Sequence, residues 1–205
     1  MSNINTIIFD LGGVLIDWNP KYVYREVFEG DENKVNWFLN EICTMEWNME
    51  HDAGRPIKEG TEILINHYPQ YETWIRIYYD RWTDMLGGPI KDSVKLLNSL
   101  KKSNNYNLYA LTNWSAELFP IAIERYDFLQ NFEGIVVSGA EKTRKPFAKI
   151  YEITLNRYAI TPKKAVFIDD NLANVKAAQK LGIHGIHFTS ADKLKSDLTN
   201  LGLQL

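Results

Sequence analysis

Five short runs of apolar residues are spaced along the chain, and stretches with helical periodicity lie between them. The runs occupy residues 6–9, 108–111, 135–137, 165–168 and 185–188. Continuous apolar runs of this length are typical of strands that are buried on both faces of a parallel sheet. One intervening stretch places Ile90, Val94 and Leu97 at the i, i+4, i+7 spacing of a helix face. This alternation predicts an α/β fold, in which a doubly wound parallel sheet is flanked by helices.

Residues 17–88 interrupt the alternation with several stretches of helical spacing, which indicates an inserted domain. We therefore expect residues 1–16 and 89–205 to form one Rossmann-like sheet domain. Residues 17–88 are expected to form an all-helical cap on it. The glycine pairs Gly12–Gly13 and Gly87–Gly88 stand at the two crossings between these parts and would suit hinges.

Polar residues follow four of the five apolar runs, namely Asp10, Thr112, Ser138 and Asp169. In open α/β sheets the ligand site lies beyond the carboxyl ends of the strands. Because these ends meet at one edge of a parallel sheet, we expect the polar residues to converge there. The sequence therefore predicts a single site built from segments that are far apart along the chain.

Two of these segments carry groups that suit a phosphorylated ligand. After Asp10, the glycines Gly12 and Gly13 allow the backbone to approach a ligand closely. Thr112 and Asn113 supply a hydroxyl and an amide that can donate hydrogen bonds to phosphate oxygens.

Two further segments add charge to the predicted site. Lys145 precedes Pro146 and is expected at the start of a helix. Asp169 and Asp170 are adjacent carboxylates just before a predicted helix that contains Asn174. Each segment also has a plain structural interpretation, since an acidic pair at a helix N-terminus is favoured by the helix dipole and a lysine can simply be solvated.

Composition excludes several classes of partner. A net charge of −3 over 205 residues argues against nucleic-acid binding, which normally requires a basic surface. No apolar run approaches the roughly 18–20 residues that span a bilayer, and the N-terminus lacks the pattern of a signal peptide. The one cysteine, Cys43, cannot form an internal disulfide, which fits a reducing compartment. We therefore expect a cytoplasmic protein, and nothing in the sequence indicates its oligomeric state.

Taken in this order, the four segments resemble the motifs of the haloacid dehalogenase superfamily. The resemblance is to its phosphatases with a helical cap inserted after the first strand, and it covers nearly the whole chain. It implies a hydrolase in which Asp10 attacks phosphorus and forms an aspartyl-phosphate, which splits one difficult displacement into two easier ones. Thr112 and Lys145 would hold the transferring phosphoryl group.

The same resemblance implies that the enzyme requires Mg²⁺. The ion would be held by Asp10, the carbonyl group of Gly12 and Asp170, with Asp169 bound directly or through water. Oxygen ligands of this kind are those that magnesium prefers. The expected partner is a small phosphorylated metabolite, with a sugar phosphate as one option.

The predicted cap is acidic and aromatic, with seven basic against fourteen acidic residues and half of the chain's 26 aromatic residues. Its charge argues against a long polyanionic substrate. The aromatic residues either pack a small helical domain or give, through Trp18 and others, a stacking wall for a cyclic substrate. In relatives a loop between cap helices points at the site, and residues 51–55 occupy that place here. His51, Arg55, Trp18 and Asn113 are therefore candidate substrate contacts.

Gly12 departs from the pattern of the phosphatases, which usually carry an aspartate at this position as general acid and base. Nothing in the sequence clearly replaces it, although Asp17 is a nearby carboxylate. Phosphate esters whose leaving groups depart without a proton are therefore expected to react best. Two alternatives remain open: a dehalogenase-type enzyme that attacks carbon without metal, and a binding protein that has little turnover.

Overall fold

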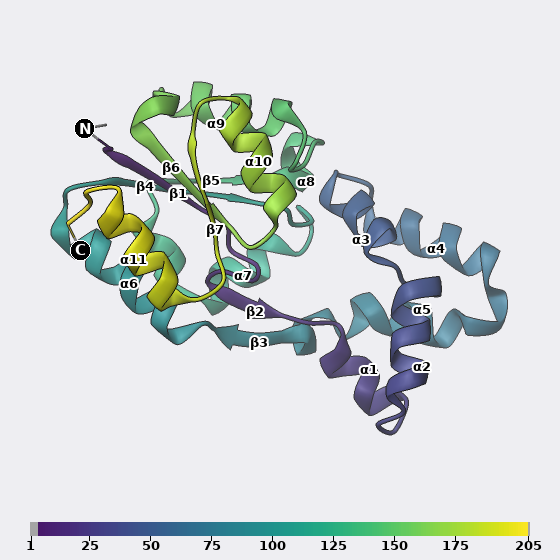
Figure 1. Cartoon of the computed structure of the whole chain (residues 1–205). Coiled ribbons are helices and arrows are strands. Elements are labelled where there is room, and N and C mark those ends of the chain that lie inside the picture. Colours follow the sequence, from purple (N-terminus) through teal and green to yellow (C-terminus); the bar gives the residue numbers. More distant parts are fainter. Residues whose placement is uncertain (1–3, 205) are drawn as a thin grey trace.

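A five-stranded parallel sheet forms the centre of the larger part of the molecule in the computed structural model, which describes residues 4–204 (Figure 1). Its strands are β1 (Thr6–Phe9), β4 (Asn107–Thr112), β5 (Gly134–Val137), β6 (Ala165–Asp169) and β7 (His184–His187). They lie in the order β5-β4-β1-β6-β7, and every neighbouring pair is parallel. The five predicted strands are thus confirmed to within one residue at each end. The Rossmann-like fold is confirmed as well. From the central strand β1 the chain adds β4 and β5 on one side and then β6 and β7 on the other.

Helices cover both faces of this sheet. The helices of the sheet domain are α6 (Lys91–Ser103), α7 (Phe119–Arg125), α8 (Ser138–Glu141), α9 (Ala148–Arg157), α10 (Leu172–Lys180) and α11 (Ala191–Asn200). Figure 1 shows α9 and α10 on one face and α6 and α11 on the other. Successive side chains of β1 alternate accordingly, because Ile8 belongs to the hydrophobic cluster under α9 and α10 whereas Ile7 and Phe9 belong to the other.

The inserted segment is a group of short helices beside the sheet domain. They are α1 (Lys21–Val27), α2 (Glu32–Trp37), α3 (Met45–Asp52), α4 (Ile57–His67) and α5 (Glu72–Asp80), with short turns of other helix types at η1 (Phe38–Ile42), η2 (Pro69–Tyr71) and η3 (Trp82–Met85). We call this group, residues 19–85, the helical cap. Within the described residues, no helix is long and apolar enough to cross a bilayer.

A two-stranded antiparallel ribbon connects the cap to the sheet domain, and the sequence pattern does not predict it. It pairs β2 (Ile16–Trp18) with β3 (Leu86–Pro89). Both expected boundaries, after residue 16 and before residue 89, fall inside these strands, so the exact division of the chain stays a prediction. Strands of three and four residues are too short to produce a periodic pattern, and their partners lie about 70 residues apart along the chain.

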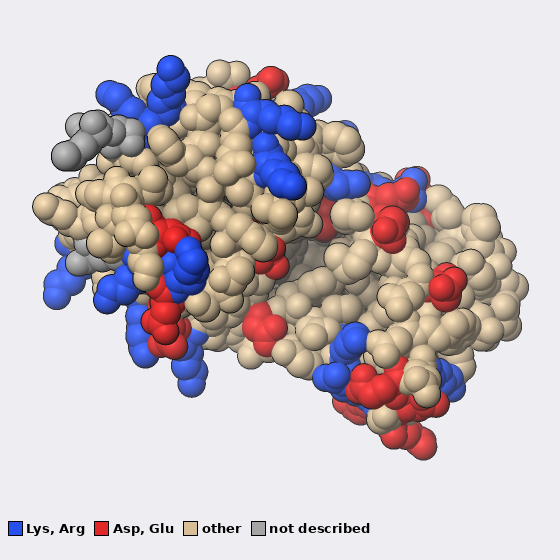
Figure 2. All heavy atoms as spheres, viewed as in Figure 1, with Lys and Arg blue, Asp and Glu red and all other residues tan. Residues whose placement is uncertain are grey.

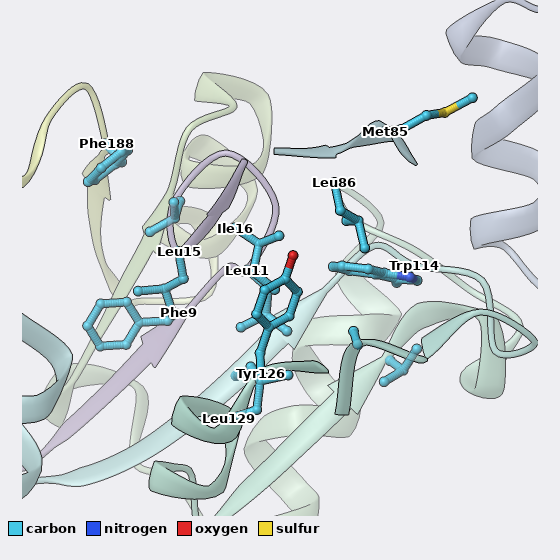
Figure 3. Close-up of a cluster of buried hydrophobic side chains, with 14 of the residues drawn as sticks. Phe9, Leu11, Leu15, Ile16, Met85, Leu86, Trp114, Tyr126, Leu129 and Phe188 are labelled. Atoms are coloured by element: carbon cyan, nitrogen blue, oxygen red, sulfur yellow. The ribbon is translucent and has the colours of Figure 1, made fainter. Parts of the chain in front are cut away.

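The ribbon rests on one hydrophobic cluster that continues from the sheet into the cap. Figure 3 shows Leu15, Ile16 and Leu86 of the ribbon region beside side chains of the sheet domain, with Met85 at the cap end. Leu15, Ile16 and Met85 are fully buried. The cap is therefore attached through packed apolar side chains at its base.

Aromatic side chains form the interior of the cap. Tyr24 packs against Phe38 with ring centroids 4.8 Å apart, and Trp47 packs against Tyr78 at 5.1 Å. The Trp47 indole also donates a hydrogen bond to the carbonyl oxygen of Gly60, at 3.0 Å. Most of the cap's aromatic content is thus explained by packing of a small domain, as one of the two interpretations of the sequence proposed.

Gly60 in α4 lies directly against side chains of α3, namely His51 and Trp47. Replacing a glycine inside a helix by alanine normally stabilises it by about 0.5–1 kcal/mol. A Cβ atom at Gly60, however, would collide with Nε2 of His51. We expect Gly60→Ala to destabilise the protein by about 1–3 kcal/mol, as overpacking does, in urea unfolding experiments. The exposed substitution Lys58→Ala in the same helix should leave the free energy of unfolding within about 0.5 kcal/mol. A raised Tm for Gly60→Ala would contradict this packing.

Candidate active site

Asp10 stands directly after β1, at the centre of the sheet and next to its topological switch point. The carboxylate is buried. Its Oδ1 atom accepts a hydrogen bond of 2.7 Å from the backbone N–H of Leu11 and lies 2.8 Å from Nζ of Lys145. Both identified donors therefore hold the same oxygen, which fixes the orientation of the carboxylate.

Lys145 is a fully buried lysine that joins two acidic strand ends. Its Nζ atom contacts Oδ1 of Asp10 at 2.8 Å and Oδ2 of Asp169 at 2.7 Å, and it donates to the carbonyl oxygen of Leu111 at 3.0 Å. An ammonium group has three donors, so these contacts use all of them. Burial opposes the positive charge, but the two carboxylates outweigh it and raise the pKa of Lys145.

Asp169 ends β6 and is completely buried. One of its oxygens accepts from the backbone N–H of Asn171 at 2.8 Å, and both accept from the side-chain amide of Asn174 at 3.0 and 3.1 Å. Together with the Lys145 contact, these bonds satisfy most of the acceptor capacity of the carboxylate. Asn174, which the sequence placed in the following helix, is thus the side chain that orients Asp169.

Three carboxylates meet at this edge of the sheet. Oxygen atoms of Asp10, Asp169 and Asp170 lie within 4.8 Å of one another. Burial raises the pKa of Asp10, with the carboxylates of Asp169 and Asp170 adding to the rise and Lys145 opposing it. Burial and Asp169 likewise raise the pKa of Asp170. Such a cluster of oxygen ligands with a single compensating cation fits a divalent metal ion, which would favour the charged carboxylates.

Thr112 is the last residue of β4 and Asn113 follows it, next to the strand end that carries Asp10. The Thr112 hydroxyl is buried and makes no hydrogen bond within the described residues, but Thr112 is not among the residues that line the cavity described next. The Asn113 side chain instead accepts from the backbone N–H of Lys145 at 2.9 Å and donates to its carbonyl oxygen at 3.1 Å. Asn113 therefore holds the Lys145 loop in place, although it also lines the cavity described next.

A cavity of about 630 Å³ lies between the sheet domain and the cap. Figure 2 shows the hollow between the two parts of the molecule, with acidic side chains near its margin. Asp10, Gly12 and Asp170 contribute polar groups at the sheet-domain end. The remaining wall is largely apolar and includes the side chains of Trp18, Met45, Met49, Tyr79, Trp82, Trp114, Leu118 and Leu172.

The four predicted substrate contacts fall into two groups. Trp18 and Asn113 line the cavity. His51 is buried inside the cap, where its Nδ1 atom lies 2.8 Å from the Tyr79 hydroxyl, and it is not among the cavity-lining residues. Arg55 forms an ion pair with Glu50 and does not line the cavity either. His51 lies on the face of α3 that is turned away from the cavity, and Arg55 lies beyond the end of α3, so both make their contacts within the cap.

A family model for haloacid dehalogenase-like hydrolases matches residues 7–188, which include both the sheet motifs and the cap. The chain belongs to the haloacid dehalogenase-like hydrolase family. The expectation from the sequence motifs is confirmed, and the protein is an enzyme of this hydrolase family. It is similar to a sesquiterpene phosphatase from Aspergillus oryzae, with 32% identity over 90% of this chain and 89% of that protein. It is also 25% identical to a phosphorylated carbohydrates phosphatase from Thermotoga maritima, over 90% of this chain and 84% of the other.

Solved structures of this haloacid dehalogenase-like family share the fold of the chain. A family enzyme from Bacteroides thetaiotaomicron aligns with a TM-score of 0.69 at 21% identity, over 98% of this chain and 100% of that one. A dehalogenase aligns with a TM-score of 0.67 at 17% identity, over 97% and 98% of the two chains. These similarities extend to enzymes of different chemistry, so the fold does not select the reaction.

Removing the Lys145 cation tests how much the two buried carboxylates depend on it. We expect Lys145→Met to destabilise the haloacid dehalogenase-like fold by about 3–5 kcal/mol near pH 7.5, because two buried charges lose their partner. The measurement is urea unfolding in the presence of a chelator. The exposed substitution Lys149→Met is the matched control and should be nearly neutral.

The penalty should shrink as the pH falls. Burial already raises the pKa of Asp10, and without the ammonium group this pKa rises further. A carboxyl group with a raised folded-state pKa favours folding below its unfolded value of about 3.9 and loses that contribution as the pH rises. The difference between Lys145→Met and wild type should therefore be smaller at pH 5 than at pH 7.5. A difference that does not change with pH would contradict the assigned ion pair.

Proposed function

We propose that this haloacid dehalogenase-like protein is a magnesium-dependent phosphatase that acts on a small phosphorylated metabolite through an aspartyl-phosphate on Asp10. The observation that carries the proposal is the meeting of three carboxylates with a buried lysine at the floor of a cavity. The metal-independent dehalogenase alternative has no need of that acidic cluster. Similarity to two phosphatases along most of the chain supports the same reaction.

Asp10 would attack phosphorus with its second oxygen. The Leu11 N–H and Lys145 both hold Oδ1, so Oδ2 is the oxygen left for the new bond. Attack forms the bond between Oδ2 and phosphorus and breaks the bond to the leaving oxygen. Water then attacks phosphorus, releases inorganic phosphate and restores the carboxylate. Because its three donors are occupied, Lys145 would act by holding the two carboxylates, and the free Thr112 hydroxyl would donate to the phosphoryl group.

The metal ion would be held by Asp10, the Gly12 carbonyl group and Asp170. Asp169 would contact it through water, since its oxygens already accept from Lys145, Asn171 and Asn174. When bound, Mg²⁺ supplies positive charge that offsets the repulsion between the carboxylates and a phosphate dianion. A solved structure of the Bacteroides thetaiotaomicron family enzyme contains magnesium and inorganic phosphate, which supports this assignment by analogy.

Chelation and replacement of the nucleophile test the reaction. We expect phosphate release from an aryl phosphate to require Mg²⁺ and to fall to the background rate in EDTA and in Asp10→Asn. Beryllofluoride, which mimics a phosphoryl group, should bind the wild-type protein but not Asp10→Asn in ¹⁹F NMR spectra. Thr112→Val should reduce kcat by about 10²-fold, as loss of one donor to a transition state does. Undiminished turnover in EDTA would instead favour the carbon-attacking alternative.

The cavity walls favour an apolar leaving group over a sugar. Methionine, tryptophan and leucine side chains form a large apolar part of the wall, although four asparagines and Ser115 also line the cavity. The apolar part offers no hydrogen bonds to sugar hydroxyls and suits an apolar group. The similarity to a sesquiterpene phosphatase at 32% identity supports the same substrate class. We therefore favour a phosphate monoester of an apolar alcohol over the sugar phosphate that the sequence left as an option.

The substitution Met49→Gln tests this preference, because it makes the cavity wall more polar with little change in side-chain shape. We expect kcat/KM to be higher for an isoprenyl phosphate than for glucose phosphates. Met49→Gln should lower kcat/KM for the isoprenyl ester by about tenfold, the cost of about 1.4 kcal/mol of lost apolar contact. The exposed substitution Ile63→Gln lies outside the cavity and is the control. Equal kcat/KM values for the two esters, unaffected by Met49→Gln, would exclude an apolar substrate.

A further inference from the structure

Gly12 leaves the site without the side chain that usually transfers protons in related phosphatases. A Cβ atom at this position would meet no other atom within 4 Å, so the space beside Asp10 is open. Asp17, the nearest carboxylate along the chain, accepts a hydrogen bond of 2.6 Å from Tyr22 and does not line the cavity. Any side chain that gives a proton to the leaving group therefore comes from another part of the molecule.

One face of helix α3 borders the cavity, and it carries both polar and apolar side chains. Met45, Asn48, Met49 and Asp52 all line it, at the i, i+3, i+4, i+7 spacing of a single helix face. Asp52 is the last residue of the helix, and it is the one cavity-lining carboxylate that the cap contributes among the described residues. It thus shares the cavity with Asp10 while coming from the opposite wall.

We infer that Asp52 is the general acid and base of this site and takes the role for which Gly12 has no side chain. The inference rests on the proposed phosphatase reaction and adds the residue that moves its protons. In the first step Asp52 gives its proton to the leaving oxygen as the bond from that oxygen to phosphorus breaks. In the second step the Asp52 carboxylate takes a proton from the water that attacks the aspartyl-phosphate, and the acid form is restored.

Contacts between cap and sheet domain hold the end of α3 at the site. The backbone N–H of Ile57 donates to Glu117 of the sheet domain at 2.8 Å. A Cβ atom at Gly54 would lie 3.0 Å from the carbonyl oxygen of Gly139 in α8, so only a glycine allows this close approach. The segment directly after Asp52 is therefore fixed against the domain that carries Asp10.

A chain of hydrogen bonds orients the Asp52 carboxylate from within the cap. Asn48 donates to Oδ2 of Asp52 at 3.4 Å, the Tyr79 hydroxyl donates to Asn48 at 3.2 Å, and Nδ1 of His51 lies 2.8 Å from that hydroxyl. If His51 carries its proton on Nδ1, the ring donates to the Tyr79 hydroxyl, and every hydrogen bond of the chain then points towards Asp52. Burial lowers the pKa of His51 to about 4, so the ring is neutral and this chain adds no charge.

The surroundings of Asp52 favour its protonated form near neutral pH. Burial raises the pKa of Asp52 to about 7, and the opposing influences are the charges of Arg144 and Lys145 and the backbone N–H of Ser115. Tyr78 and Tyr79 of α5 also face the carboxylate, and burial raises the pKa of both phenols, so they stay neutral. A carboxylate at the C-terminus of a helix is further disfavoured by the helix dipole. A group that titrates near the working pH is well suited to donate and accept protons.

The test compares phosphate esters whose leaving groups differ in acidity. In Asp52→Asn we expect kcat/KM for alkyl phosphates to fall by about 10²- to 10⁴-fold, the usual effect of general acid catalysis. Esters of acidic nitrophenols leave without a proton, so their kcat/KM should change by less than about threefold. In the wild type, the ratio of alkyl to nitrophenyl kcat/KM should decrease as the pH rises through about 7, because the acid form is lost. This pH dependence should be absent in Asp52→Asn.

Two further variants separate catalysis from structure. Asp17→Asn removes the other candidate carboxylate and should leave the leaving-group dependence unchanged. Gly12→Asp in the Asp52→Asn background should restore part of the alkyl activity, since the space at Gly12 is open. Equal losses for alkyl and nitrophenyl esters, or an unchanged alkyl rate in Asp52→Asn, would overturn the inference alone. A wild-type protein that hydrolyses no phosphate ester would refute the proposed function and this inference with it.

Discussion

The buried ammonium group of Lys145 is the constraint on which the arrangement of this site depends. Asp10 and Asp169 end neighbouring parallel strands, and the geometry of the sheet brings their carboxylates together inside the protein. Two such charges cannot be buried side by side without a compensating cation. Lys145 supplies it and also bonds to the end of β4 through the Leu111 carbonyl oxygen, so one side chain links three adjacent strands.

The remaining contacts of the sheet domain maintain this arrangement. The side-chain amide of Asn113 bonds to both the N–H and the carbonyl oxygen of Lys145. The side-chain amide of Asn174 donates to both oxygens of Asp169. With the lysine donors and most of the Asp169 acceptors occupied in this way, the groups left for a metal ion or a phosphoryl group include Oδ2 of Asp10, the Asp170 carboxylate and the Thr112 hydroxyl. The sheet domain therefore presents a fixed set of charges with little freedom to adapt to different substrates.

The cap supplies what the sheet domain lacks. Its α3 helix brings an apolar surface and one carboxylate to the opposite wall of the cavity, and the ribbon of β2 and β3 attaches it through buried side chains. Gly12 leaves space that a side chain would otherwise fill. In the proposed mechanism, the nucleophile and the metal ligands come from the sheet domain, and the groups for substrate selection and proton transfer come from the cap.

The sequence by itself determined the sheet, the order of its motifs and the identity of Asp10, Lys145 and Asp169 as a converging group. It could do so because buried parallel strands leave continuous apolar runs, and because such strands must end at a common edge. The short ribbon of β2 and β3 left no such pattern, since three or four residues cannot show a period. Asp52 stands beside His51 in the segment that the sequence did single out. Only the tertiary structure decided between them, because a helix turns by 100° per residue and its packing selects which face meets the cavity. Trp47 and His51 face the cap interior, whereas Met45, Asn48, Met49 and Asp52 face the site.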